Sequence, residues 1–207
     1  MARVLCKTEI DAVMDLREQC EFVVLSPEQL ITGFDCGNDD LNDFFNHDAI
    51  KYQRQMFAGT YFFRHNTTKQ VVCAFSLSPD SIKTMWLPGS RRKKVKEFIP
   101  HEKSLSSYPA FLIGRLGVSA EFSKQGVGSQ LLEAVKRFCF VNYPSFCRFL
   151  LVEAYNEPPV LNFYRKNDFN FVFSTEEQER DYHKRTNISE PLLTRIMFYD
   201  MIHWENQ

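Results

Sequence analysis

The chain has 207 residues, 44% of them hydrophobic and 14% aromatic, and its formal net charge at pH 7 is −1. This composition excludes a disordered chain, and the length suits one domain with a substantial core. The balanced charge gives no general attraction to nucleic acid or membrane. No apolar run reaches the ~18 residues of a membrane span, and the N-terminus lacks the apolar core of a secretory signal. A cytoplasmic protein that does not enter the membrane is therefore expected.

The first part of the chain predicts two helices and three strands. Thr8 is placed to cap a helix over 9–20, and Asn38 or Asp39 a second helix that runs to about Phe57. Runs rich in β-branched and aromatic residues predict strands over 22–25, 60–64 and 70–77. The last two are separated by a short polar stretch, which is typical of a hairpin.

Residues 79–109 form the least regular stretch, punctuated by four prolines, and they contain the basic run RRKKVK at 91–96. Three interpretations are open: a solvated loop or helix face, a contact for a polyanion, or a mobile lid on the substrate side. The first is favoured, because charge runs are usually solvated.

Residues 111–141 predict a buried strand, a loop with two glycines and a long amphipathic helix. Gly126 and Gly128 bracket Val127, and neither carries a Cβ that would keep a ligand from the backbone. The first N–H groups of a helix and the positive end of its dipole attract anions. The alternative is a tight strand-to-helix turn that needs glycine for structural reasons alone. The apolar residues that share one face of this helix are Leu131, Leu132, Val135, Phe138 and Cys139.

The remaining elements complete an α/β (α+β) pattern. A continuous apolar strand over 148–155 is followed by a helix that Pro158 opens and that runs through Tyr164. Two last strands are expected over 169–173 and 192–202, with a polar segment of uncertain form at 176–190. Strands and helices alternate from 111 to 173, so the sheet is expected to be mixed, with at least one crossover.

The cysteines and histidines do not predict a metal site. None of the six cysteines forms a C-x-x-C pair, and several lie in apolar patterns where a small buried thiol is expected. The five histidines are scattered without the spacing of metal ligands.

Three ordered motifs together carry a resemblance to a known family. GRLGV at 114–118, SKQGVGSQLL at 123–132 and EAYNEPPVLNFYRKNDF at 153–169 resemble the central motifs of the GNAT acyl-coenzyme A transferases. Upstream, FDCGNDDLNDFFNHDA at 34–49 resembles a GNAT subgroup that includes bacterial toxins acetylating aminoacyl-tRNA. The resemblance implies a single GNAT-like domain over 1–207, with a core at about 22–202 and a mixed central sheet flanked by helices on both faces.

The resemblance also implies acetyl-CoA as co-substrate and assigns residues to it. The strand residues that would orient the acetyl group through their backbone are Leu116, Gly117 and Val118. The loop residues that would hold the pyrophosphate are Ser123, Lys124, Gln125, Gly126, Val127, Gly128 and Ser129.

Two departures from the family pattern stand out. Ser123 occupies a position where the family usually has Gln or Arg, and Asn167-Asp168 replaces a glycine region. Asn and Asp both tolerate left-handed turn geometry.

Tyr164 is the predicted catalytic residue. A phenol with a pKa near 10 can give a proton to a departing thiolate of comparable basicity. The alternative is a core aromatic residue beside Phe163. Asn156 is predicted to bond the pantetheine arm, with a helix cap or a strand end as the alternative. No general base is identified, since Glu153 ends a strand at a suitable level but could instead pair with Arg115 or Arg148.

The predicted function is transfer of acetyl from acetyl-CoA to a primary amine by direct attack. The acceptor class is left open between an aminoacyl-tRNA, a protein amine and a small metabolite, as is homodimerisation. A non-catalytic coenzyme A-binding or interaction module on the same fold is the alternative. A nucleotide-binding P-loop is excluded, because no Lys-Ser/Thr pair follows Gly128.

Overall fold

The structure of the protein is a computed structural model, which describes residues 14–100, 105–144, 147–185 and 192–204. The chain forms two compact units. The first unit is drawn from Met1–Phe75 and Arg115–Glu133, and the second from Ser76–Gly114 and Ala134–Gln207. The strands form a seven-stranded sheet with the order β1-β2-β3-β4-β5-β7-β6.

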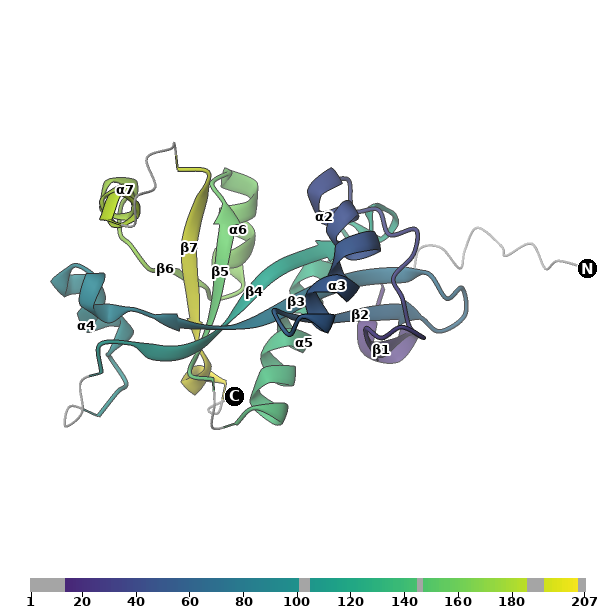
Figure 1. The fold of residues 1–207 in the computed structure, drawn as a ribbon, viewed down its shortest axis with the longest axis horizontal. Helices are drawn as coiled ribbons and strands as arrows, with labels where there is room; N and C mark the ends of the chain where they lie inside the picture. Colours follow the sequence, from purple (N-terminus) through teal and green to yellow (C-terminus); the bar gives the residue numbers. More distant parts are fainter. Residues whose placement is uncertain (1–13, 101–104, 145–146, 186–191, 205–207) are drawn as a thin grey trace, which may run out of the picture. The chain divides into compact units, whose positions relative to one another are not determined.

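The helices and strands of the first unit follow the predicted order (Figure 1). They are α1 (Leu16–Gln19), β1 (Cys20–Val24), α2 (Asp39–Asp43), the π-helix η2 (Phe44–Asp48), α3 (Ala49–Arg54), β2 (Gly59–His65) and the start of β3 (Val71–Ile82). The helix predicted from Asn38 is confirmed, and the Asn38 Oδ1 accepts the Leu41 N–H at 3.0 Å. Thr8 lies outside the described residues, and the described helix before β1 is capped by Asp15.

Aromatic side chains dominate the core of the first unit. Phe34, Phe44 and Phe45 pack edge to face with ring centroids 5.3 Å apart, and Phe62 is fully buried beside them. Strands β1 and β2 are antiparallel, with Phe22 opposite Phe63. The predicted upstream helix and strands therefore pack as one unit around these rings.

The end of β4, the short helix η4 (Ala120–Phe122) and the start of α5 belong to the first unit, and the second unit holds the remaining elements. They are η3 (Thr84–Trp86), α4 (Gly89–Val95), β4 (Tyr108–Val118), α5 (Val127–Asn142), β5 (Phe149–Tyr155), α6 (Pro158–Lys166), β6 (Asn170–Phe171), α7 (Glu176–Arg185), β7 (Thr194–Asp200) and η5 (Met201–His203). Strand β4 is parallel to β5, whereas β5 and β6 are antiparallel to β7. The mixed sheet is therefore confirmed.

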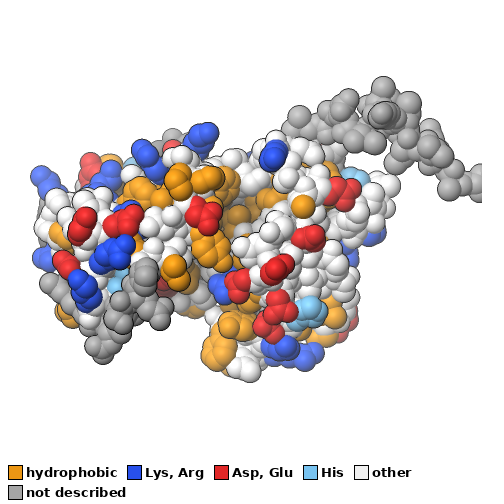
Figure 2. Space-filling view, turned by 90° about the horizontal axis from the view of Figure 1, so that it is seen from above, with side chains coloured by type: hydrophobic (Ala, Val, Ile, Leu, Met, Phe, Trp, Pro, Cys, Tyr) orange, Lys and Arg blue, Asp and Glu red, His pale blue; other side chains and the backbone are white. Residues whose placement is uncertain are grey.

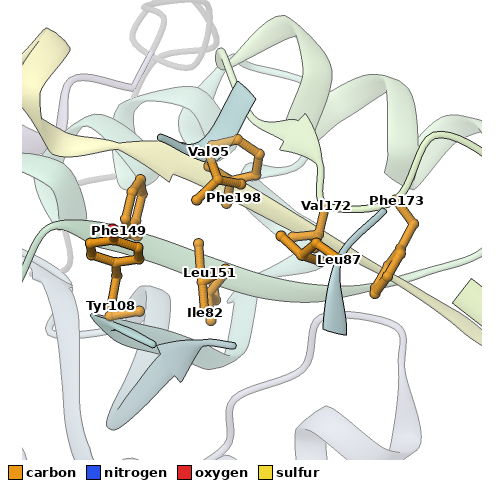
Figure 3. Packing of buried hydrophobic residues seen from close by; sticks show 10 residues of the cluster. Ile82, Leu87, Val95, Tyr108, Phe149, Leu151, Val172, Phe173 and Phe198 are labelled. Carbon is orange, nitrogen blue, oxygen red and sulfur yellow. The ribbon is translucent and has the colours of Figure 1, made fainter. Parts of the chain in front are cut away.

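Helices cover both faces of the sheet in the second unit. One face carries Leu151 and Phe198, which are register partners and belong to a cluster that includes Val95 of α4, with Tyr182 of α7 packed against it (Figure 3). Tyr199 points to the opposite face, because side chains alternate along a strand. There it meets Lys136 of α5, whose amine lies 4.0 Å from the ring centroid.

The basic run at 91–96 forms most of α4, and part of it is structural. The Arg91 guanidinium donates to the backbone carbonyls of Phe171 and Val172. Arg92 donates to the carbonyl oxygens of Thr84 and Leu87, each at 3.1 Å. The interpretation of this run as a solvated face therefore holds for Arg92, Lys93 and Lys94, which are exposed, whereas Arg91 is half-buried. The guanidinium groups of Arg91 and Arg92 pair backbone carbonyls that would otherwise need other donors.

Among the described residues, no helix is both long and apolar enough to cross a membrane.

Candidate functional site

The end of β4 is fastened within the first unit by backbone hydrogen bonds and by close packing. Ser119 donates its N–H to the Val72 carbonyl at 2.9 Å, and Ala120 donates to Asp35 at 2.8 Å. Gly117 is buried, and a Cβ added there would lie 3.2 Å from the Phe34 ring. Packing therefore favours glycine at 117, because a larger residue would require the Phe34 ring to shift.

The glycine loop forms an exposed turn in front of α5. Lys124 and Gly126 both have left-handed backbones, with φ of +62° and +78°. The Gly126 carbonyl accepts the N–H groups of Ser129 at 3.1 Å and Gln130 at 3.2 Å, which starts the helix. The amides of Val127 and Gly128 donate to no acceptor in the part of the chain that the structure describes. Two N–H groups at a helix start, beside a left-handed residue, can donate hydrogen bonds to an anion.

The predicted loop residues from 123 to 129 are contiguous around this turn, and two of their side chains brace it. The Ser123 hydroxyl donates to the Ala120 carbonyl at 2.9 Å, which closes the short helix η4 (Ala120–Phe122). Gln125 reaches back with its Nε2 to the Glu121 carbonyl at 3.4 Å. These contacts supply local bracing in a loop where the family's usual Gln or Arg is replaced by Ser123.

Val127 is the one loop residue whose side chain turns inward. It is buried, whereas Ser123, Lys124, Gly126 and Ser129 are exposed. The buried Val127 side chain thus anchors the loop, while the neighbouring Gly126 stays exposed to solvent.

Gln130 has a structural role that the sequence did not indicate. Its Oε1 accepts the Leu16 N–H at 2.9 Å, and its Nε2 donates to the Met14 carbonyl at 2.7 Å. A glutamine that follows a serine at a helix start carries no local sign of such long-range bonds.

Tyr164 lies on α6 among aromatic rings of the second unit. Only 8% of its surface is exposed, and its ring meets Phe163 at 5.1 Å and Phe169 at 5.5 Å between centroids. Burial raises the pKa of Tyr164 well above its ordinary value, so the phenol stays protonated at neutral pH. Its hydroxyl has no hydrogen-bond partner among the described residues. Tyr164 therefore packs among core aromatic rings, and its phenol carries a proton at neutral pH.

The turn after α6 has a left-handed aspartate where the GNAT motif that this segment resembles has glycine. Asp168 adopts a left-handed backbone, with φ of +68°, as the sequence predicts. The buried Lys136 holds the turn by donating to the Asn167 carbonyl at 2.9 Å. Lys136 was not predicted to be buried, although its place between Val135 and Cys139 on the apolar face was a signal.

Asn156 is bound into the structure rather than placed as a helix cap. Its Nδ2 donates to the Glu176 Oε1 at 3.2 Å and to the Leu192 carbonyl at 3.3 Å. The residue before α6 is Glu157, so the helix-cap alternative is wrong. Asn156 ties β5 to α7 and to the chain entering β7, and its Oδ1 accepts no hydrogen bond in the described part of the chain.

Glu153 forms no ion pair with either arginine considered for it. Arg148 pairs with Asp200 at 2.7 Å, and Arg115 lies 3.7 Å from Asp40. Glu153 is exposed on the same face of β5 as Leu151. The alternative in which this carboxylate is a buried partner of an arginine is therefore wrong.

Comparison with solved structures identifies proteins that share this fold. No protein-family profile matches the chain. Among solved structures, a tyrosine-to-phenylalanine variant of KacT has a TM-score of 0.69 at 21% identity, covering 91% of this chain and 99% of that one. AtaT complexed with acetyl-methionyl-tRNAfMet has a TM-score of 0.68 at 19% identity, covering 90% and 98%. A bacterial toxin also scores 0.68, at 16% identity. The chain therefore has the GNAT fold of the toxins KacT and AtaT, as its sequence motifs predicted.

Proposed function

We propose that the protein is an N-acetyltransferase that moves the acetyl group of acetyl-CoA to a primary amine. The amine nitrogen attacks the thioester carbonyl carbon, so that a C–N bond forms and the C–S bond breaks. Tyr164 gives its phenolic proton to the departing thiolate and regains one from water, while the attacking nitrogen loses its extra proton to solvent. Solved structures of AtaT on this fold contain acetyl-CoA, which supports the choice of donor.

The single observation that best supports binding of acetyl-CoA, the acetyl donor, is the exposed turn at Gly126. The Val127 and Gly128 amides and the helix dipole favour a phosphate there, and no side chain covers the left-handed glycine, whose Cβ position has nothing within 4 Å. The backbone of Leu116, Gly117 and Val118 is proposed to orient the acetyl group. Asn156 is proposed to accept a hydrogen bond from the pantetheine arm through its Oδ1.

A charge placed beside the turn tests this proposal. Ser129 is exposed in the first turn of α5, where an aspartate suits the helix dipole but repels a pyrophosphate. We expect Ser129→Asp to weaken acetyl-CoA binding about tenfold or more, as measured by calorimetry. Its stability to urea should be unchanged or slightly higher.

Ser129→Asn is the matched control, since it has the same shape without the charge. It should bind acetyl-CoA within about twofold of the wild type. Equal affinity of the aspartate variant, the asparagine variant and the wild type would show that no anion binds at this turn.

An aminoacyl-tRNA is the acceptor favoured by one specific observation beyond the fold. AtaT is solved with acetyl-methionyl-tRNAfMet, and α4 of this protein exposes two lysines, Lys93 and Lys94, that make no hydrogen bond or ion pair among the described residues. On the face shown in Figure 2, acidic and basic side chains are interspersed. Contact with tRNA would therefore depend on a local group of cations rather than on the whole surface.

Neutralising Lys93 and Lys94 tests that acceptor. If charged tRNA binds there, the Lys93→Gln/Lys94→Gln variant should lower the slope of log affinity against log salt by about 2. Lys51→Gln/Lys69→Gln, which removes two exposed lysines of the first unit, is the control. Arg91 and Arg92 must be left intact, because they bond backbone carbonyls. Identical slopes for both variants and the wild type would exclude α4 as the contact.

A further inference from the structure

A cavity lies in the second unit on the sheet face that α7 covers. Its volume is about 100 Å³. Most of the apolar side chains that line it belong to the cluster shown in Figure 3: Ile82, Leu87, Leu151, Val172 and Phe173. Leu112 and Ile196, which pack against that cluster, also line the cavity. An apolar cavity of about 150 Å³ holds a benzene molecule, so this one suits a group of about four carbon atoms. It is far too small for the nucleotide or pantetheine portion of a coenzyme.

Polar side chains complete the lining of the cavity. They are Asp80 and Ser81 near the end of β3, Lys83 just after it, Glu153 on β5 and Tyr182 on α7. The two carboxylates outnumber the single ammonium, and neither forms an ion pair with Lys83 among the described residues. Asp80 accepts the Ser81 N–H through its Oδ1 at 2.6 Å. Glu153 makes no hydrogen bond or ion pair in the described part of the chain.

Both carboxylates line the same cavity as the Tyr182 side chain. Burial raises the pKa of Tyr182, and the negative charges of Asp80 and Glu153 raise it further. The Tyr182 phenol therefore stays neutral at neutral pH and can accept or donate a hydrogen bond. An apolar recess beside two negative charges is a site for a cation that carries a hydrocarbon group.

We propose that this cavity binds a primary ammonium with a short apolar substituent. The ammonium faces Asp80 and Glu153, and the hydrocarbon group enters the recess beside Leu151. The inference rests on the proposed function, because such a group is the acceptor amine before it loses its proton. In this proposal Glu153 binds the acceptor amine and does not serve as an ion-pair partner that stabilises the fold.

Three small molecules separate the parts of this proposal. Isoamylamine has the charge and a branched five-carbon chain, of which the four carbons beyond the ammonium-bearing carbon form the apolar body. Isoamyl alcohol lacks the charge, and methylamine lacks the apolar body. Binding is measured by NMR titration of the whole protein without coenzyme. Isoamylamine should bind most tightly, and both of the other probes should bind at least about fivefold more weakly.

Variants of the lining carboxylates test the assignment of residues. Glu153→Gln/Asp80→Asn should raise the Kd of isoamylamine about tenfold and leave that of isoamyl alcohol within about twofold. Asp181→Asn is the control, since it removes a carboxylate from α7 next to Tyr182 that does not line the cavity. Both changes are at exposed positions, and urea unfolding verifies that the fold is kept.

The inference is wrong if isoamyl alcohol binds as tightly as isoamylamine, or if the double variant binds isoamylamine like the wild type. Failure of the proposed function gives a different pattern. If acetyl-CoA does not bind while isoamylamine binds as described, the proposed transferase function is wrong and the amine-binding cavity is supported.

Discussion

Replacing Tyr164 by phenylalanine should lower the rate of acetyl transfer about a hundredfold or more and leave acetyl-CoA binding unchanged. A positioned general acid contributes roughly 10²–10⁴ to a rate, and phenylalanine keeps the packing while removing the proton. Because the hydroxyl has no hydrogen-bond partner among the described residues, its loss leaves no buried group unsatisfied. Single-turnover release of free thiol, together with calorimetry of acetyl-CoA binding, measures both quantities.

The pH profile gives a second readout of the same residue. Burial raises the pKa of Tyr164, so the acid form persists above the ordinary phenol pKa of about 10. The rate should therefore show no fall from phenol ionisation between neutral pH and about pH 9.5. Tyr155→Phe, at the exposed end of β5, is the matched control and should retain full activity. Full activity in Tyr164→Phe would remove this residue from the mechanism.

Replacing Glu179 by alanine should destabilise the protein by about 3–5 kcal/mol. Glu179 is fully buried, and its Oε2 lies 2.6 Å from the Arg195 Nε. Its Oε1 accepts the Ile196 N–H at 2.6 Å, so both oxygens bind β7. The variant leaves a buried guanidinium without its counter-charge and a backbone amide without its acceptor. Urea unfolding monitored by far-UV circular dichroism measures the loss.

An exposed pair on the same helix provides the control. Arg180 and Glu176 lie 3.5 Å apart, and both side chains are more than two-fifths exposed. Arg180→Ala should cost no more than about 0.5 kcal/mol, as for other exposed helix pairs. Glu179→Gln should fall between the two, because its amide oxygen can still accept a hydrogen bond. Equal unfolding midpoints for Glu179→Ala and Arg180→Ala would show that α7 is not held by the buried pair.

The elements with strong local signals were predictable. The helix from Asn38 and the turn at Gly126 follow from a capping residue and a glycine that adopts a left-handed backbone. The parallel β4–β5 pair follows from the crossover pattern of strand, helix and strand. The cause of the helix and of the turn lies within a few residues, and that of the strand pair lies in the order of three consecutive elements.

The features that the sequence did not predict depend on distant partners. The segment 176–190 reads as polar, yet it contains α7, because Glu179 reaches Arg195 and Ile196 across the fold. The prolines of 79–109 suggest an irregular loop, yet α4 forms there and Arg91 bonds carbonyls at 171 and 172. Secondary-structure propensity depends only on nearby residues and cannot predict such contacts, because partners distant in the sequence decide which charged side chains are buried.

The sequence motifs identify which residues to consider for the proposed site. They do not indicate the contacts that those residues make in the fold. The loop at 123–129 and Tyr164 were both identified from the motifs. The contacts of Asn156 with Glu176 and Leu192 were not, nor was the buried place of Lys136. The cavity of Asp80, Glu153 and Tyr182 joins three elements that are distant in the chain, so no spacing rule could indicate it.

The most direct test of the account is release of free thiol from acetyl-CoA by the wild-type protein with a panel of amines. The panel holds a charged tRNA, a peptide with a free amino terminus, and isoamylamine. The account predicts that at least one amine accelerates thiol release and appears as its acetylated product in equal amount. Tight binding of acetyl-CoA with no acceleration by any of the three would contradict it, and would identify a coenzyme-binding module without transferase activity.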